Sequence, residues 1–270
     1  MGTVSEGDTK ERVDRILWRK NKTLTVAYFS PTEGTKRAAE ILAGMLSQNP
    51  QYLDLTRRKL RKQKQSFTEK DLLLAAAPVY GGQLPRMREA LFVNLHGENT
   101  PCILMSAYGN RHYDNTLAQM QKILEDRGFY CIGAIAPVIP HIYSEKLGNG
   151  RPDELDIQEI RKFAVTVKKR LEEKFHGPIE LPGVAEPEPK QMKPVAKFWD
   201  SEKCNGCQAC VQKCPAAAID KETYTVDESL CINCMRCAKI CPSKARSYDC
   251  GDVQKYLESN FTARREVEWF

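Results

Sequence analysis

Residues 23–46 read TLTVAYFSPTEGTKRAAEILAGML, and this stretch joins two different structural periods. Its apolar beginning predicts a buried strand, and its second half has the spacing of an amphipathic helix. The turn between them, residues 30–35, carries the hydroxyl groups of Ser30, Thr32 and Thr35. Backbone N–H groups and the helix dipole at such a turn favour an anion, so we expect a phosphate site here.

Four further apolar runs follow the first one, and helical patterns lie between most of them. The runs cover residues 51–55, 71–80, 101–109 and 129–139, and the helical patterns cover 34–47, about 84–95, 114–127 and 154–175. Continuous apolar runs that alternate with helices are typical of a parallel sheet covered on both faces. The sequence therefore predicts an α/β domain.

Composition limits the classes of function. The chain has 270 residues, of which 41% are hydrophobic and 28% charged, enough for one large domain or two ordinary ones. It contains no apolar run of membrane-spanning length, and its polar beginning lacks the apolar core of a secretory signal. We expect a cytoplasmic protein without a membrane partner. The net charge of +6 does not by itself indicate a nucleic-acid partner.

The cysteines give the most specific signal. Eight of the eleven lie in the segments CNGCQACVQKCP (204–215) and CINCMRCAKICP (231–242), each spaced C-x2-C-x2-C-x3-C-P. Three cysteines spaced in this way can each bind a different iron of one cubane, while the fourth binds the other cluster. We expect two [4Fe-4S] clusters. Cluster I would take Cys204, Cys207, Cys210 and Cys241, and cluster II would take Cys231, Cys234, Cys237 and Cys214.

Structural zinc is the alternative, but it commonly uses two C-x2-C pairs separated by a longer loop. The doubled run with a proline after each fourth cysteine instead resembles the bacterial two-cluster ferredoxins over about 50 residues. Residues 196–250 contain eight Lys or Arg and seven Asp or Glu, whereas many free ferredoxins are strongly acidic. A ferredoxin tethered to its partner needs less steering by charge.

The turn at residues 30–35 resembles the T/S-x-T-G-x-T loop with which flavodoxins bind the phosphate of FMN. Two further loops, in APVYGGQLPRM (77–87) and SAYGNRHYDN (106–115), follow the third and fourth apolar runs, as the two loops beside the flavin ring do in flavodoxins. The resemblance implies a doubly wound, parallel, five-stranded sheet of order 2-1-3-4-5 with FMN at the switch point. It implies cofactor-binding roles for Ser30, Pro31, Thr32, Glu33, Gly34, Thr35, Pro78, Val79, Tyr80, Gly81, Gly82, Tyr108, Gly109, Asn110 and Tyr113.

Glu33 departs from the flavodoxin pattern, because glycine usually stands at its position. A carboxylate that pointed at a phosphate dianion would oppose binding. We therefore expect the Glu33 side chain to point outward, towards solvent and the helix N-terminus. We also expect its backbone to avoid positive φ, which is strained for residues other than glycine.

The whole chain resembles the flavodoxin–ferredoxin fusions of anaerobes, the EFR-type ferredoxins, over residues 22–250. We expect an N-terminal extension (1–21), an FMN-binding flavodoxin-like domain (22–176), a linker with five prolines (177–195), a small α+β two-cluster ferredoxin domain (196–250) and a helical C-terminal tail (251–270). The tail has apolar residues at helical spacing, which predicts a short helix docked on another domain.

The resemblance implies an electron carrier that passes electrons between the two clusters and FMN, coupling one-electron and two-electron partners in anaerobic metabolism. No catalytic residue is expected, so whether the chain is an enzyme stays open. Two alternatives are an FMN-dependent reductase of a small molecule, fed by the clusters, and a redox sensor that lacks FMN. The expected partners are redox proteins, and a second copy of the chain is a further candidate.

The basic stretch TRRKLRKQK (56–64) contains six cations and has no place in this scheme. A solvated surface segment is the simplest interpretation. A docking site for an acidic redox partner is the second. A nucleic-acid site is the third, and neither a recognised nucleic-acid-binding fold nor an aromatic platform accompanies it.

Overall fold

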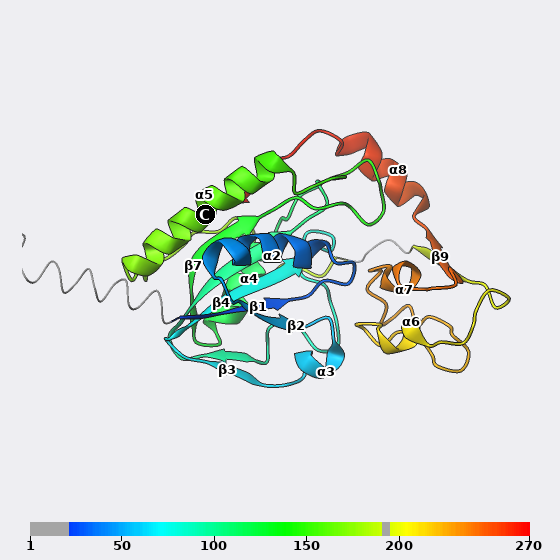
Figure 1. The fold of residues 1–270 in the computed structure, drawn as a ribbon. Helices are drawn as coiled ribbons and strands as arrows, with labels where there is room; N and C mark the ends of the chain where they lie inside the picture. The colour runs from blue at the N-terminus through cyan, green and yellow to red at the C-terminus, as the bar shows by residue number, and fades with distance from the viewer. Residues whose placement is uncertain (1–21, 191–194) are drawn as a thin grey trace, which may run out of the picture.

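The computed structural model describes residues 22–190 and 195–270. The predicted extension 1–21 and residues 191–194 of the predicted linker lie outside the described residues. The N-terminal part contains a six-stranded sheet of order β10-β7-β6-β4-β1-β2 (Figure 1). Its strands are β1 (Thr23–Tyr28), β2 (Gln51–Asp54), β4 (Asp71–Pro78), β6 (Thr100–Ala107), β7 (Phe129–Ala136) and β10 (Glu268–Trp269).

The five strands from β1 to β7 pair in parallel, and along the sheet they take the order 2-1-3-4-5. This is the predicted flavodoxin-like arrangement, and it is confirmed. Strands β4 and β6 are buried along most of their length, as strands covered on both faces must be. The sixth strand, β10, pairs antiparallel with β7 and was not predicted.

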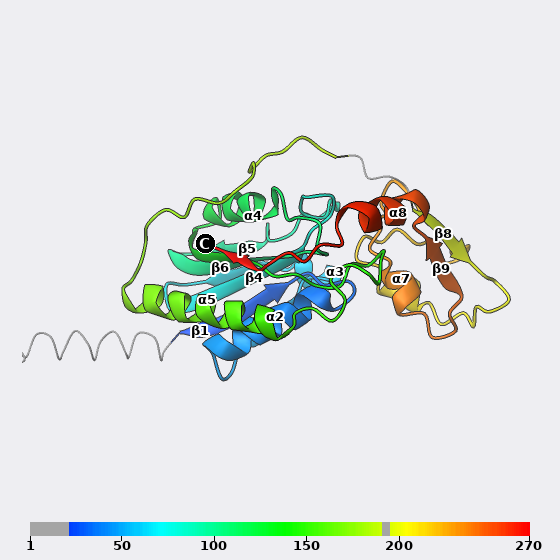
Figure 2. The ribbon, with the colours of Figure 1, turned by 90° about the horizontal axis from the view of Figure 1, so that it is seen from above.

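Helices cover both faces of the sheet and bury a core layer on each side (Figure 2). On one face, α2 (Gly34–Leu46) and α5 (Glu154–Glu172) bury Leu42, Phe163 and Val167. On the other face, α4 (Thr116–Glu125) buries Leu117 and Met120. The helices predicted at 34–47, 114–127 and 154–175 are therefore present, and each end differs from its prediction by at most three residues.

The prediction of a helix at about residues 84–95 is wrong. That segment is irregular and ends in β5 (Leu95–Gly97), which pairs with β3 (Gln65–Phe67) in a small two-stranded sheet. Its apolar residues, Leu84, Leu91 and Phe92, are buried as a helix would bury them. However, Phe92 has a φ of 67°, which interrupts any helix at that residue.

Beyond residue 195 the chain forms a small region beside the carboxyl ends of the parallel strands, with its helices coloured yellow and orange in Figure 1. It contains β8 (Ala196–Trp199) paired antiparallel with β9 (Arg246–Asp249), and the one-turn helices α6 (Ala209–Gln212) and α7 (Arg236–Lys239). The helix α8 (Gly251–Asn260) follows, and then the chain returns to the sheet as β10. In the described ranges, no helix is long and apolar enough to cross a membrane.

Candidate functional site

Three loops meet at the carboxyl edge of the parallel sheet. The first loop (30–35) follows β1, the second (78–82) begins at the end of β4, and the third (108–113) follows β6. Because β1, β4 and β6 are neighbours in the sheet, the loops that the sequence singled out lie side by side. An open α/β sheet binds its ligands at such an edge, where the strand order reverses.

The first loop presents the amino end of α2. Ser30 and Thr35 are buried at 2% exposure, and the Ser30 hydroxyl accepts a hydrogen bond from the Lys36 backbone N–H at 3.0 Å. The Ser30 N–H donates to the hydroxyl of Thr56 at 2.8 Å, which ties the loop to the chain after β2. Glu33 occupies the N-cap position but makes no side-chain cap, so the first turn of α2 keeps backbone donors for an anion.

Glu33 itself combines one expected feature with one correction. Its carboxylate is exposed to solvent, as expected, and lies 3.3 Å from the Lys36 ammonium and 3.8 Å from the Arg236 guanidinium. Its φ is 72°, however, so the expectation that this backbone avoids positive φ is wrong. The loop keeps the left-handed turn for which glycine is the usual residue, and the glutamate adopts it under strain.

The small region formed by residues 195–250, called the cluster region from here on, contacts the first loop directly through two cations of α7. Arg236 donates to the carbonyl oxygen of Pro31 at 2.5 Å, and Lys239 donates to that of Thr32 at 2.6 Å. Both cations therefore lie beside the candidate phosphate site. No sequence pattern marks Arg236 or Lys239 as site residues, because α7 meets the loop only through the packing of the two regions.

The second loop forms a tight turn in which Tyr80 and Gln83 exchange backbone hydrogen bonds at 2.8 and 3.1 Å. Gly81 and Gly82 both have positive φ, as the two central residues of a type I′ turn require. Burial, and to a smaller extent the nearby Cys234, raise the pKa of the Tyr80 phenol. A cavity of about 410 Å³ separates Tyr80 and Gln83 from residues 228–233.

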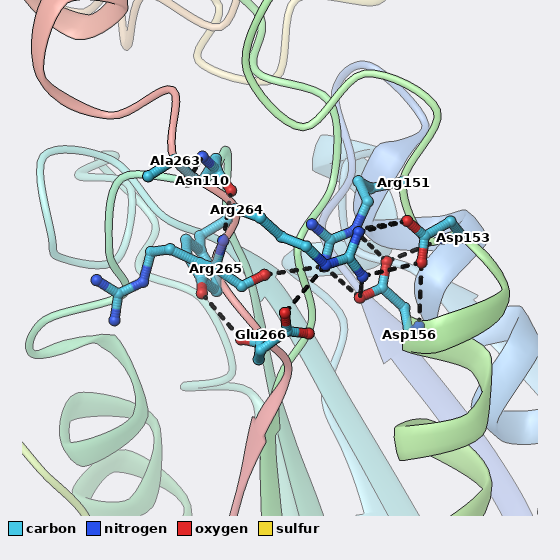
Figure 3. Close-up of polar contacts among 9 residues, drawn as sticks. Asn110, Arg151, Asp153, Asp156, Ala263, Arg264, Arg265 and Glu266 are labelled. Carbon is cyan, nitrogen blue, oxygen red and sulfur yellow. Dashed lines mark hydrogen bonds and ion pairs between the residues drawn. The ribbon is translucent and has the colours of Figure 1, made fainter.

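The third loop is held by the C-terminal tail, residues 261–270 (Figure 3). The Asn110 amide nitrogen donates to the carbonyl oxygens of Phe261 and Ala263 at 2.6 and 2.8 Å, and its oxygen accepts from the Arg265 N–H at 3.3 Å. The Tyr113 hydroxyl donates to the Glu268 carboxylate at 2.7 Å. The polar groups of this loop are therefore already bonded within the chain.

Acidic residues at the start of α5 fix the same tail (Figure 3). Arg264 donates to both carboxylate oxygens of Asp153, at 2.6 and 3.1 Å, and Arg151 donates to the Arg265 carbonyl at 2.9 Å. Arg151 also forms a buried, bidentate pair with Asp156. Hydrogen bonds from Arg264 and the neighbouring backbone hold the pKa of Asp153 well below its usual range. Because the contacts with the tail span more than a hundred residues of sequence, only the folded chain brings their partners together.

The eight clustered cysteines separate into two sets of four around two cavities. One cavity is lined by Cys204, Cys207, Cys210 and Cys241, and the other by Cys214, Cys231, Cys234 and Cys237. In each set the fourth cysteine of one run has crossed to the first three cysteines of the other run. This is the placement expected for two cubanes, in which each thiolate binds a different iron.

The cavity walls suit iron–sulfur clusters. The second cavity is largely apolar, with Ile219, Val226 and Met235 among its residues. The backbone N–H of Ala218 donates to the Cys214 sulfur at 3.4 Å, and that of Ala245 donates to the Cys241 sulfur at 3.2 Å. Such donors favour the charged thiolate that binds iron. Burial raises the pKa of the Cys234 thiol to about 12, so metal binding must release its proton.

The fit to a flavin differs between the two ends of the site. The first loop suits a phosphate, because hydroxyls, a helix amino end and two cations converge there. The third loop does not offer its polar groups, since Asn110 and Tyr113 are bonded to the tail. The His141 ring also covers Gly109 so closely that a β-carbon added there would lie 2.3 Å from it.

Comparison with known proteins gives two findings. Residues 203–245 match the family of 4Fe-4S dicluster domains, and none of the curated proteins matches the chain.

Similar solved structures include a short-chain flavodoxin associated with a non-canonical PDU bacterial microcompartment. Its identity to this chain is 18% and the TM-score is 0.38, and the match covers 56% of this chain and 99% of that chain. A putative flavoprotein from Bacteroides eggerthii follows at 16% identity and a TM-score of 0.36, covering 54% of this chain and 98% of that one. A flavodoxin from the domain Archaea has 13% identity and a TM-score of 0.35, and the match covers 55% of this chain and 98% of that chain.

Proposed function

We propose that this chain is an electron-transfer protein, built as a flavodoxin–ferredoxin fusion, in which two [4Fe-4S] clusters exchange electrons with FMN. One observation carries the proposal: the two crossed sets of four cysteines line two cavities, in a segment that matches the dicluster family. The second of these cavities adjoins the crevice at the carboxyl ends of β1 and β4. Arg236, which lines it, donates to Pro31 of the first loop, and Cys231 lines a neighbouring cavity together with Tyr80.

Each set of cysteines would supply four thiolates to its cluster. The apolar residues of the second cavity lower the local dielectric, and the N–H donors at Cys214 and Cys241 offset the negative charge that accumulates there. Cys207 is exposed, so the first cavity opens towards solvent. The second cavity lies nearer the flavodoxin-like domain, because Cys231 and Cys214 also line pockets shared with that domain. Cluster II would therefore lie between cluster I and the crevice.

FMN would be anchored through its phosphate. When bound, it supplies both one-electron and two-electron chemistry. Ser30, Thr35 and the amino end of α2 would bind the phosphate, and Arg236 would add a cation. Tyr80 would form one wall of the ring site, beside a cavity whose volume is typical of small-molecule sites. We assign no flavin contact to Asn110 or Tyr113, because the tail binds both.

A carrier without flavin, acting as a redox sensor, is the second candidate, and the contacts of the tail with the third loop favour it. An anaerobic reductive titration separates the two candidates. Each cluster takes about one electron and FMN about two, so a protein loaded with both should take about four electrons per chain. Uptake of about two electrons, with no flavin bound after incubation with FMN, would favour the sensor.

A further inference from the structure

A groove of about 770 Å³ lies between the flavodoxin-like domain and the cluster region. On one side it is lined by the first loop and by α3 (Arg58–Arg61) with its neighbouring residues. On the other side it is lined by residues 212–214 and by Arg236. Cys214, the crossed ligand of cluster II, therefore forms part of the groove wall.

The groove is strongly basic. Its acidic residues are Glu33 and Asp54, and its cations are Lys36, Arg57, Arg58, Lys59, Lys62, Lys213 and Arg236. Among the residues that the structure describes, Arg58, Lys59 and Lys213 form no ion pair, so no described carboxylate neutralises their charge. The Nε atom of Arg236 is buried without a hydrogen-bond partner. This charge includes most of the basic stretch at residues 56–64, to which the proposed function gives no role.

A buried arginine fixes the basic segment against the cluster region. Arg61 is only 2% exposed, and it donates to the carbonyl oxygens of Leu55 at 2.8 Å and of Pro215 at 2.6 Å. Pro215 directly follows Cys214. The hydrogen bond from Arg61 thus holds α3 beside the edge of cluster II, and the position of the cations relative to the cluster is built into the fold.

We propose that this groove docks a small acidic redox protein that exchanges electrons with cluster II. The inference rests on the proposed function, since it requires a cluster at Cys214. In the transfer, one electron leaves a reduced [4Fe-4S]⁺ centre of the partner and reduces the [4Fe-4S]²⁺ cluster II. No bond forms or breaks, and no proton moves.

The exposure of the cations favours a protein over a small anion. The Arg57 side chain is 74% exposed and that of Lys62 is 58% exposed, so they lie at the rim of the groove. Exposed charges add little to affinity, but they steer a charged partner and raise its association rate by about 10- to 1,000-fold. Residues 196–250 carry nearly balanced charge, whereas the groove is lined by seven cations and two carboxylates, so the groove has the charge to recognise an acidic carrier.

Stopped-flow kinetics of the cluster-loaded chain would test the proposal, with a dithionite-reduced, acidic bacterial two-cluster ferredoxin as the probe. The test variant is Arg58→Glu, Lys59→Glu and Lys213→Glu together. The matched control reverses three cations outside the groove, Arg161→Glu, Lys168→Glu and Lys221→Glu. Reduced methyl viologen, which needs no acidic docking site, reports whether the clusters of each variant still accept electrons. Because Lys213 precedes a cluster ligand, Arg58→Glu with Lys59→Glu alone serves as a second test variant.

We expect the ferredoxin reaction of the unmodified chain to slow at least about 10-fold between about 20 and 200 mM salt. At low salt the test variants should be at least about 10-fold slower, and the control should stay within about twofold. Equal rates for test and control variants would overturn the docking site, as would a reaction that does not respond to salt. Inhibition by pyrophosphate but not by polyglutamate would show a small-anion site and overturn it too. If methyl viologen reduces no cluster in the unmodified chain, the proposed function itself fails.

Discussion

Replacing Glu33 by glycine should slightly stabilise the protein. At its φ of 72°, a residue other than glycine costs about 1–2 kcal/mol. Glycine removes this strain, but it also gives the unfolded chain more conformational freedom, which lowers the free energy of unfolding by roughly 0.4–1 kcal/mol. The exposed ion pair with Lys36, at 3.3 Å, is also lost and contributes about 0.3 kcal/mol. The net gain in the free energy of unfolding is about 0.5 kcal/mol, which raises the melting temperature by about 1–2 °C.

The same variant should bind FMN as tightly as the unmodified chain or more tightly. An exposed carboxylate several ångströms from a phosphate opposes binding by up to about 1 kcal/mol in water, and salt screens this repulsion. The FMN dissociation constant should therefore fall by no more than about fivefold, measured by quenching of flavin fluorescence in flavin-free, cluster-loaded protein.

Glu33→Ala is the matched control for both measurements, because it removes the charge and keeps the positive φ. It should change FMN affinity as Glu33→Gly does, without the gain in stability. A loss of FMN affinity above about 10-fold in both variants would refute the reasoning, since the carboxylate would then hold the site together. Equal stabilisation by alanine and glycine would refute the argument from backbone strain.

Three further predictions concern the clusters, pH and the tail. Cys214→Ser should abolish the same paramagnetic signal as Cys231→Ser, and a match to Cys204→Ser would exclude the crossed ligation. Burial, with Arg111 nearby, lowers the pKa of His141 from 6.5 to about 4. Between pH 6.5 and pH 4 the unfolded chain therefore binds a proton at His141 that the folded chain does not bind. The free energy of unfolding falls as the pH drops through this range. From pH 7 to 5.5 the free energy of unfolding should fall by roughly 1 kcal/mol, measured by thermal melting, and His141→Asn should abolish this fall. The same fall in the variant would show that another group causes it. Arg264→Ala should lower the free energy of unfolding by roughly 1 kcal/mol, a value reduced to allow for the solvent exposure of its partner Asp153. The variant should also speed hydrogen exchange of the backbone amides in β10. Unchanged exchange would show that Arg264 does not hold the tail.

The parts of the fold that depend on local pattern could be predicted from the sequence. The alternation of continuous apolar runs with helices predicts a parallel sheet covered on both faces. The resemblance of the three loops to those of flavodoxins implies the order of its five strands. The pairing of Cys214 and Cys241 with the opposite cysteine runs follows from the spacing and the prolines. The alternation of strands with helices and the spacing of the cysteines are both visible in neighbouring residues of the chain.

Features that depend on the packing of distant segments could not be predicted. Strand β10 has two residues and a polar Glu268, which gives no strand signal. The contacts of Arg236 and Lys239 with the first loop appear only when the cluster region docks on the sheet. The helix predicted at about 84–95 failed for the opposite reason: its apolar spacing is helical, but the turn at Phe92 buries the same side chains without a helix.

The central claim is that one chain holds two [4Fe-4S] clusters and an FMN. Anaerobic purification followed by assay of iron, acid-labile sulfide, zinc and flavin per chain tests it most directly. We expect about eight irons, about eight sulfides and about one FMN per chain, with the visible absorption of both cofactor types. Zinc in place of iron, with no flavin, would contradict it.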